Sequence, residues 1–140
     1  MAISMYQASV PQFVKMLTNL SNILKKGEEF AGTKGIDSAA LVEGCLAPDM
    51  FPLSKQVQIA CDQVKNGMAR LAGVEPPKFE DNETTFAQLQ DRIAKTIAFA
   101  NSLKPAQVGS CLPPLPVTTY YSAFGNKTLA LFFKALTLLR

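Results

Sequence analysis

Three stretches of the chain space their apolar residues as an α-helix does, and this periodicity limits the fold more than any other feature of the sequence. In the first stretch the apolar residues recur at alternating intervals of four and three, and they are Tyr6, Val10, Phe13, Leu17, Leu20 and Leu24. This spacing puts them on one face of a helix. Ser-x-x-Gln capping signals start at Ser4 and Ser9. We expect a short turn, a kink at Pro11 and then a helix that ends near Gly27.

The second stretch predicts two helices separated by a proline. Asp37 is expected to cap a short helix from Ser38 to about Leu46, and Asp49 to cap a longer one from about Met50 to Ala72. Gly73 stands where a left-handed C-cap is required.

A third long helix is predicted over about Glu83 to Leu103. Asp81 or Asn82 is expected to cap it, and Pro105 to stop it.

The last part of the chain differs in composition from the stretches before it. Residues 105–119 contain four prolines and predict an irregular connector, and residues 129–139 predict a short amphipathic helix. Because three apolar stripes are buried better with a fourth partner, we predict an all-α fold, an antiparallel up-and-down four-helix bundle. The expected domain is a single one over 1–140, with a core at 1–104 and an atypical tail at 105–140.

Composition excludes several classes of site. The sequence has no His, so Ser-His-Asp and Cys-His catalysis and His-ligated metal centres are excluded. Its net charge is +3, and residues 105–140 hold Lys127, Lys134, Arg140 and no acid. Three charges are too thin a patch to bind nucleic acid. We therefore predict no metal, no cofactor and no nucleic-acid partner.

The cysteines favour a reducing compartment. Cys45, Cys61 and Cys111 form neither a C-x-x-C pair nor a disulfide framework, so three reduced thiols are expected. The alternative is that Cys61 or Cys45 is a nucleophile, which would require Lys, Arg or a helix N-terminus to lower its pKa. The chain begins without signal-peptide character, and residues 129–139 are too short to span a bilayer. A soluble, cytoplasmic protein without membrane contact is predicted.

Asp49 is the most interesting polar residue. It is expected either to serve only as an N-cap or to face the mouth of the bundle with Tyr6 and Gln56, which lies two turns further along the same face. Tyr6, Asp49 and Gln56 are therefore the candidate ligand-binding residues. A second polar set on the same helix is interpreted as a solvated face, and it comprises Lys55, Gln58, Asp62 and Lys65.

Several segments resemble a known family. Residues 4–11, 46–60, 79–86 and 92–97 are similar to the family called domain of unknown function nineteen-ninety-three, which belongs to the DinB/YfiT-like superfamily of four-helix bundles. The resemblance covers residues 3 to about 104 and implies the same bundle. Superfamily relatives bind a metal through three histidines, so no metal residue can be carried over to this chain.

The tail departs from that family pattern. Val117 to Tyr121 looks like a remnant of a family motif, and Pro116 stands where the family has His. The family's Gly-Lys-x-Asp ending is missing. The tail is either rebuilt or the product of a misread gene model.

Two functional hypotheses follow. The first is a non-catalytic bundle that acts through self-association as a homodimer, or through partner or small-molecule binding, because its apolar stripes exceed the available partners. The second is a metal-independent, transferase-like enzyme with a pocket between the first and second helices, by analogy with superfamily relatives that act as thiol transferases.

Overall fold

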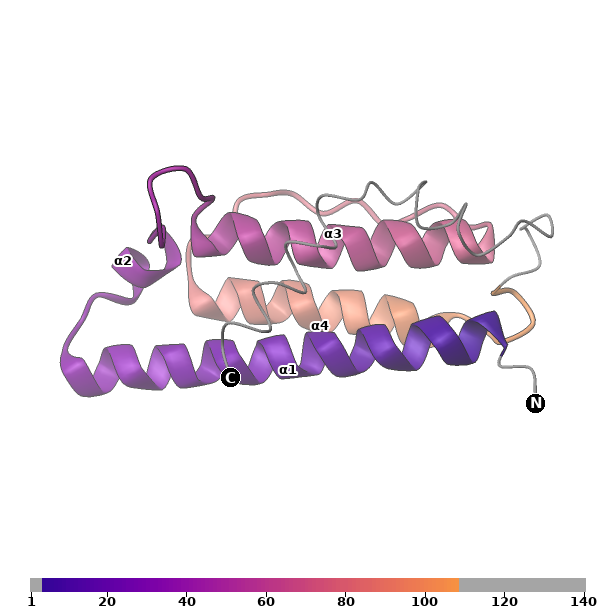
Figure 1. Ribbon diagram of the computed structural model, residues 1–140, viewed down its shortest axis with the longest axis horizontal. Helices are drawn as coiled ribbons and strands as arrows, with labels where there is room; N and C mark the ends of the chain where they lie inside the picture. Colours follow the sequence, from indigo (N-terminus) through magenta and orange to yellow (C-terminus); the bar gives the residue numbers. More distant parts are fainter. Residues whose placement is uncertain (1–3, 109–140) are drawn as a thin grey trace.

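The computed structural model describes residues 4–108, and every regular element within that range is an α-helix. Figure 1 shows the three long helices side by side and the short α2 at one end. The predicted all-α fold is confirmed. The expected helix at 129–139 and most of its connector lie outside the described residues. The helices are α1 (Met5–Lys34), α2 (Ser38–Val42), α3 (Leu53–Ala72) and α4 (Phe86–Ser102).

α1 is longer than the sequence suggested. A capping box between Ser4 and Gln7 starts it, and Gly35, with a φ of 66°, ends it. The predicted stop near Gly27 is wrong, and the helix also continues through Pro11. Gly27 does not adopt a positive φ, and Ala31, one heptad after a buried leucine, is itself buried. Burial of that next turn therefore extends the helix past the glycine.

Asp49 does not cap α3. The N-cap is Pro52, without a side-chain hydrogen bond, and the helix starts three residues later than predicted. A proline disfavours helical geometry in the residue before it, so Phe51 cannot join the helix. The predicted end is confirmed, because Gly73 has a φ of 64° and Val74 donates to the carbonyl of Ala69 at 3.0 Å.

Two other boundaries also differ from the predictions. α2 ends at Val42 rather than near Leu46, because the carbonyl of Gly44 accepts from the N–H of Leu53 at 3.1 Å and ties this link to α3. α4 is capped by Thr85, through a capping box with its N3 residue, and not by Asp81 or Asn82.

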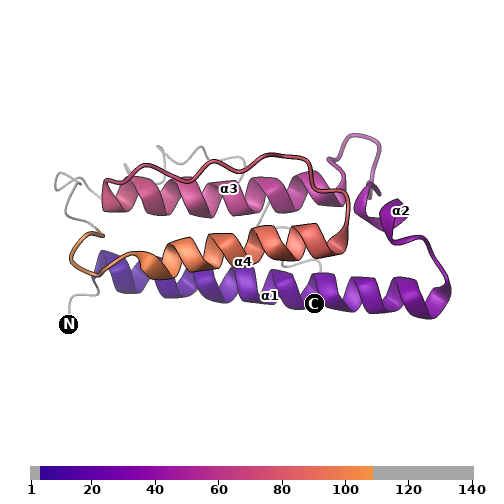
Figure 2. The same cartoon turned by 180° about the vertical axis from the view of Figure 1, so that it is seen from behind.

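α4 runs parallel to α3 and antiparallel to α1, so the order of directions is not up-and-down. The link between α3 and α4, residues 73–85, returns along the whole length of α3 before α4 begins (Figures 1 and 2). An ion pair supports the parallel direction. It joins Lys55, in the first turn of α3, to Asp81, just before α4, and so places the starts of both helices at the same end of the bundle. We call residues 74–85 the crossover segment.

The core is a shared apolar interior of α1, α3 and α4. α4 packs closely on both other long helices, whereas α1 and α3 touch each other less. The fully buried side chains at its centre are Leu17, Met68, Leu89 and Ile93. The face of α1 that contributes Leu17 is the predicted one, and its seven-residue repeat of Val10, Leu17 and Leu24 continues to Ala31.

The last turns of α1 overhang the bundle. A Cβ on Gly27 would lie 3.7 Å from the ring of Phe86, the first residue of α4. Residues 28–34 therefore extend beyond the start of α4 by about 10 Å. Figure 2 shows this end of α1 projecting past α3 and α4, with α2 beside it. The overhang leaves the outer side of α1 without a neighbouring long helix.

Candidate functional site

The side chain of Arg92, in the second turn of α4, is 2% exposed and is enclosed by α3 and the crossover segment. Its Nη1 donates to the carboxylate of Glu83 at 2.7 Å and to the backbone carbonyl of Glu80 at 3.0 Å. Its Nη2 donates to the carboxylates of Asp62 and Asp81, both at 2.9 Å. One guanidinium therefore joins α3, α4 and the crossover segment.

Two lysines of α3 complete this network. The Nζ of Lys65 lies 2.9 Å from the carboxylate of Asp62, and the Nζ of Lys55 lies 2.7 Å from that of Asp81. Together with the guanidinium and its third carboxylate partner, the network contains three cations and three carboxylates. The formal charges of these six groups sum to zero, so the network has no unpaired charge with which to bind an ionic ligand.

The interpretation of this α3 face as solvated is wrong. The crossover segment covers it, so that Gln58 is 5% and Lys65 6% exposed, while Asp62 is half-buried. The amide Nε2 of Gln58 donates to the carboxylate of Glu83 at 2.9 Å. The acids of the crossover segment were the signal for this contact, because they match the polar side of α3.

An aromatic ring closes the network. The Nζ of Lys65 lies 4.6 Å from the ring centroid of Phe79, and the Cζ of Arg92 lies 5.5 Å from it. Cations at these distances are attracted to the negative face of the ring. The buried Nε of Arg92 has no hydrogen-bond partner among the described residues.

Two members of the network, Arg92 and Asp81, have shifted pKa values. Burial acts to lower the pKa of Arg92, but the hydrogen bonds and charges of Glu83 and Asp62 together outweigh it and raise that pKa above its ordinary value. The hydrogen bond from Lys55, aided by the charge of Arg92, lowers the pKa of Asp81. Both shifts favour the charged, paired state.

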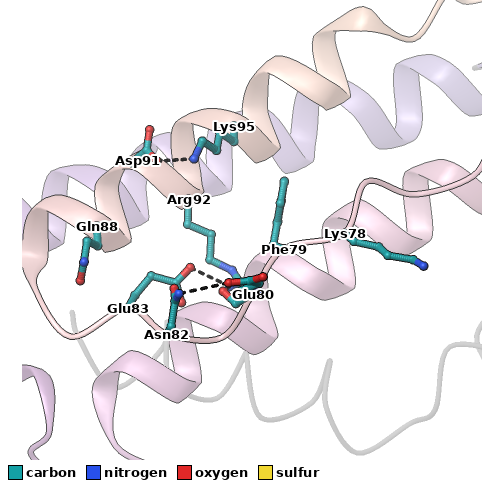
Figure 3. A pocket seen from close by; sticks show the side chains of 9 residues that line it. All are labelled: Lys78, Phe79, Glu80, Asn82, Glu83, Gln88, Asp91, Arg92 and Lys95. Carbon is teal, nitrogen blue, oxygen red and sulfur yellow. Dashed lines mark hydrogen bonds and ion pairs between the residues drawn. The ribbon is translucent and has the colours of Figure 1, made fainter.

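A hollow of about 290 Å³ lies between the crossover segment and α4, above Arg92. Figure 3 shows its polar lining, with Arg92 pointing toward Glu83 and Lys95 paired with Asp91. The Lys95–Asp91 distance is 2.6 Å, and both side chains are largely exposed. Since Arg92 and Lys95 already hold protein carboxylates, the geometry around them is that of an anchor that fastens the crossover segment to the helices.

A second feature lies at the overhang of α1. Most of the strongly exposed large apolar side chains of the described residues fall between residues 23 and 51, and they are Ile23, Phe30, Ile36, Leu46 and Phe51. Phe30 is 51%, Phe51 61% and Leu46 89% exposed. We call these five side chains the overhang surface. Exposed apolar side chains commonly mark interaction sites where they join into one patch.

The candidate ligand-binding residues are not all brought together. Tyr6 lies half-buried in the first turn of α1 against the core, and Asp49 is exposed in the link before α3. Gln56 lies in the first turn of α3, where its Nε2 donates to the carbonyl of Phe51 at 2.8 Å. Because α1 and α3 run in opposite directions, Tyr6 lies at the other end of the bundle from Asp49 and Gln56 (Figure 1).

The two described cysteines differ in environment. Cys61 is fully buried, and this desolvation raises its pKa to about 11, although a hydrogen bond to Thr96 opposes the shift. A thiol of that kind is protonated at neutral pH and is a poor nucleophile. Cys45 is exposed. Cys111 lies outside the described residues.

Residues 4–108 lack two kinds of feature. Their His, Cys, Asp and Glu side chains form no group of three arranged to hold a metal ion. Their helices include none with both the length and the hydropathy to span a bilayer.

Comparison with known proteins agrees with the fold. Residues 5–112 match the family model described as Domain of unknown function (DUF1993). Among solved structures, a DinB family member protein from Shewanella denitrificans is similar, with 38% sequence identity and a TM-score of 0.78. The match covers 91% of this chain and 78% of that one. Comparison with curated proteins finds no match.

Proposed function

Since the chain belongs to the DUF1993 family of DinB-like helical bundles, whose name assigns no activity, we propose a function from its surface. The protein is a non-catalytic binding module. Its overhang surface holds an amphipathic helix of a partner protein.

The observation that carries this proposal is the exposure of large apolar side chains at one end of the molecule. Phe30, Leu46 and Phe51 each have more than half of their surface in contact with solvent. Each aromatic or leucine side chain that moves from water into an interface contributes about 1.5–3 kcal/mol. Nothing in the core requires these residues to be apolar, whereas a partner surface would.

The arrangement on α1 fits a helical partner. Ile23 and Phe30 are seven residues apart, two helical turns along one face. A partner helix recognised by such a stripe would place its own apolar residues at i, i+3, i+4 and i+7.

The Arg92 network supports this choice indirectly. Its three cations and three carboxylates are paired with one another. A ligand would have to break these pairs, which costs several kcal/mol for a buried ion. We therefore assign the network to stability and the overhang surface to function.

The other hypotheses are less well supported. An enzyme that uses Tyr6 with Asp49 and Gln56 would require side chains from opposite ends of the bundle to meet (Figure 1). A homodimer would use the same overhang surface, and it is therefore an outcome that the following experiment separates.

The test uses a fluorescent helical peptide of three heptads with Leu at the a and d positions and Gln elsewhere. Fluorescence anisotropy measures its affinity for the full chain and for the double variant Phe30→Ser/Phe51→Ser. We expect the double variant to weaken binding at least about tenfold, because two exposed aromatic contacts are lost. Sedimentation velocity on the same samples measures the oligomeric state.

The matched control is Met5→Ser, which removes an exposed apolar side chain at the other end of α1. It should leave the affinity unchanged. Equal binding by wild type and the double variant would contradict the proposal. If the chain is a dimer that becomes a monomer in the double variant, and the peptide does not bind, the overhang surface serves self-association. That outcome also contradicts the proposal.

A further inference from the structure

We propose that the crossover segment opens and closes as one unit while the three long helices stay packed, and that its contacts with Arg92 hold it closed. The inference goes beyond the proposed function, because it concerns a motion of residues 74–85 and not binding at the overhang surface. The observation behind it is that charged and polar contacts, rather than apolar burial, attach this segment to the helices.

The crossover segment contributes nothing to the buried apolar core. The core includes Ala72 at the end of α3 and resumes at Phe86, the first residue of α4, with no residue between them. Val74 is 37% exposed, and Phe79 is half-buried against two cations. Because the free energy of apolar burial scales with the area removed from water, opening this segment loses little of it.

Backbone hydrogen bonds hold the segment only at its two ends. The N–H of Val74 donates to the carbonyl of Ala69 in α3 at 3.0 Å. The carbonyl of Thr85 accepts from the N–H of Leu89 in α4 at 3.1 Å. Between these ends, residues 75–84 make no backbone–backbone hydrogen bond within the described part of the chain. The segment can therefore lift away from the helices and remain attached at both ends.

One guanidinium holds the segment at three points. Arg92 donates to the carboxylates of Glu83 and Asp81 at 2.7 Å and 2.9 Å. It also donates to the backbone carbonyl of Glu80 at 3.0 Å. Because a single side chain makes all three contacts, they form and break together. Opening is therefore cooperative over residues 80–83, as expected for a unit that unfolds locally.

The surface beneath the segment is polar. It bears Gln58 and Lys65 of α3, which are 5% and 6% exposed, together with Arg92 of α4. Opening returns these groups to water, and their hydration offsets part of the interactions that are lost. The helices therefore do not have to separate when the segment opens.

The segment is long enough for this motion. α3 has 20 residues and is about 30 Å long. The crossover segment spans up to about 40 Å when it is fully extended. The difference lets its middle part move away from α3 without displacing the start of α4. α4 itself stays in place because it packs closely on both α1 and α3.

Thiol labelling tests the proposal on the full chain. In a chain with Cys45→Ser and Cys111→Ser, the substitution Gln58→Cys places a thiol beneath the crossover segment, and the buried Cys61 is the internal reference. Ellman's reagent is applied at pH 8 and at several urea concentrations below the unfolding transition. Fragmentation of the labelled peptide by mass spectrometry measures the rate at each thiol.

The two thiols should respond differently. We expect position 58 to react at least about tenfold faster than Cys61, because opening the segment is a smaller event than separating the helices. Its rate should also depend weakly on urea, since little surface is exposed, whereas the rate of Cys61 should depend on it steeply.

A latch variant and a matched control test the role of the ion pairs. Glu83→Gln removes the charge that Arg92 holds and should raise the rate at position 58 about tenfold. Asp91→Asn removes an exposed carboxylate of α4 that pairs with Lys95, and it should leave that rate unchanged. Circular dichroism confirms that each variant folds.

A measurement on the unaltered chain covers the case in which Gln58→Cys does not fold. Limited digestion with trypsin should cut after the exposed Lys78, within the segment, before it cuts after Lys65 or Arg70 in α3. Mass spectrometry of samples taken over time gives the order of cleavage.

Three results would overturn the inference. Equal rates and equal urea dependence at position 58 and Cys61 would mean that the segment opens only when the whole fold does. A rate at position 58 that Glu83→Gln leaves unchanged would mean that the contacts with Arg92 do not hold the segment closed. Cleavage within α3 as early as after Lys78 would mean that the helix opens together with the segment.

Discussion

The guanidinium of Arg92 and the carboxylate of Glu83 lie 2.7 Å apart, and this pair fastens the crossover segment to α4. Arg92 is 2% exposed and Glu83 is largely buried, so the pair is shielded from solvent. Because the same guanidinium also reaches Asp62 on α3, it fixes the position of three segments at once. The parallel arrangement of α3 and α4 depends on the crossover segment. Without the Arg92 pairs, this segment would contribute few apolar contacts to hold it in place.

Replacing this arginine should destabilise the fold strongly. Arg92→Met leaves the largely buried carboxylate of Glu83 without its cation, and the loss of one member of such a buried pair typically costs about 3–5 kcal/mol. Urea denaturation followed by circular dichroism measures the free energy of unfolding. The control is Lys95→Met, which breaks the exposed pair with Asp91 and should cost less than about 1 kcal/mol. Equal effects of the two substitutions would show that the network is not an anchor.

Asp81 should give the fold a component of acid sensitivity. Its pKa is lower in the folded state than its ordinary value of about 3.9. The charged carboxylate therefore stabilises the fold above about pH 4, and this stabilisation is lost as the pH falls through the folded pKa. Asp81→Asn should be less stable than wild type at pH 7, and the difference should shrink as the pH falls through the folded pKa of Asp81. A difference that is independent of pH would contradict the assignment.

The two described cysteines should label at very different rates. In the variant Cys111→Ser, a thiol reagent such as Ellman's reagent at pH 8 should modify one thiol rapidly, the exposed Cys45. Cys61 should react only on unfolding, because burial raises its pKa to about 11. Mass spectrometry of the peptides identifies the modified residue. Rapid labelling of Cys61 in the native protein would mean that this part of the core opens.

Gly27 should be replaceable with a gain in stability. It lies in the interior of α1, where Gly costs about 0.5–1 kcal/mol relative to Ala. A Cβ there would meet the ring of Phe86 at 3.7 Å, an ordinary contact distance. Gly27→Ala should therefore raise the free energy of unfolding by about that amount, as measured by urea denaturation. Gly35→Ala is the contrasting variant, and it should lower stability because Gly35 has a φ of 66°.

Helical periodicity predicted the core well. The apolar faces of all three long helices were expected from the sequence, and the left-handed end at Gly73 followed from its position after the last apolar residue. The extension of α1 was missed because Gly27 resembled a stop. The seven-residue repeat that continues to Ala31 was the signal that could have revealed it.

The polar network was not predictable from periodicity. Arg92 lies three residues after the buried Leu89 and four before the buried Thr96, at the edge of the apolar stripe of α4. Judged from α4 alone, a side chain at that position could be exposed to solvent. Arg92 is buried because the crossover segment covers it. The direction of α4 depends on the path of this segment, and a one-dimensional pattern does not encode such a path.

The central claim is that partners bind at the overhang surface and not at the hollow above Arg92. Two-dimensional ¹H–¹⁵N NMR of the full chain, titrated with the three-heptad peptide of Leu and Gln, tests it most directly. The account predicts that the largest shift changes occur in residues 23–51, centred on Phe30, and that residues 78–95 change little. Changes concentrated around Lys78, Glu80 and Arg92 would contradict it and assign the binding site to the hollow.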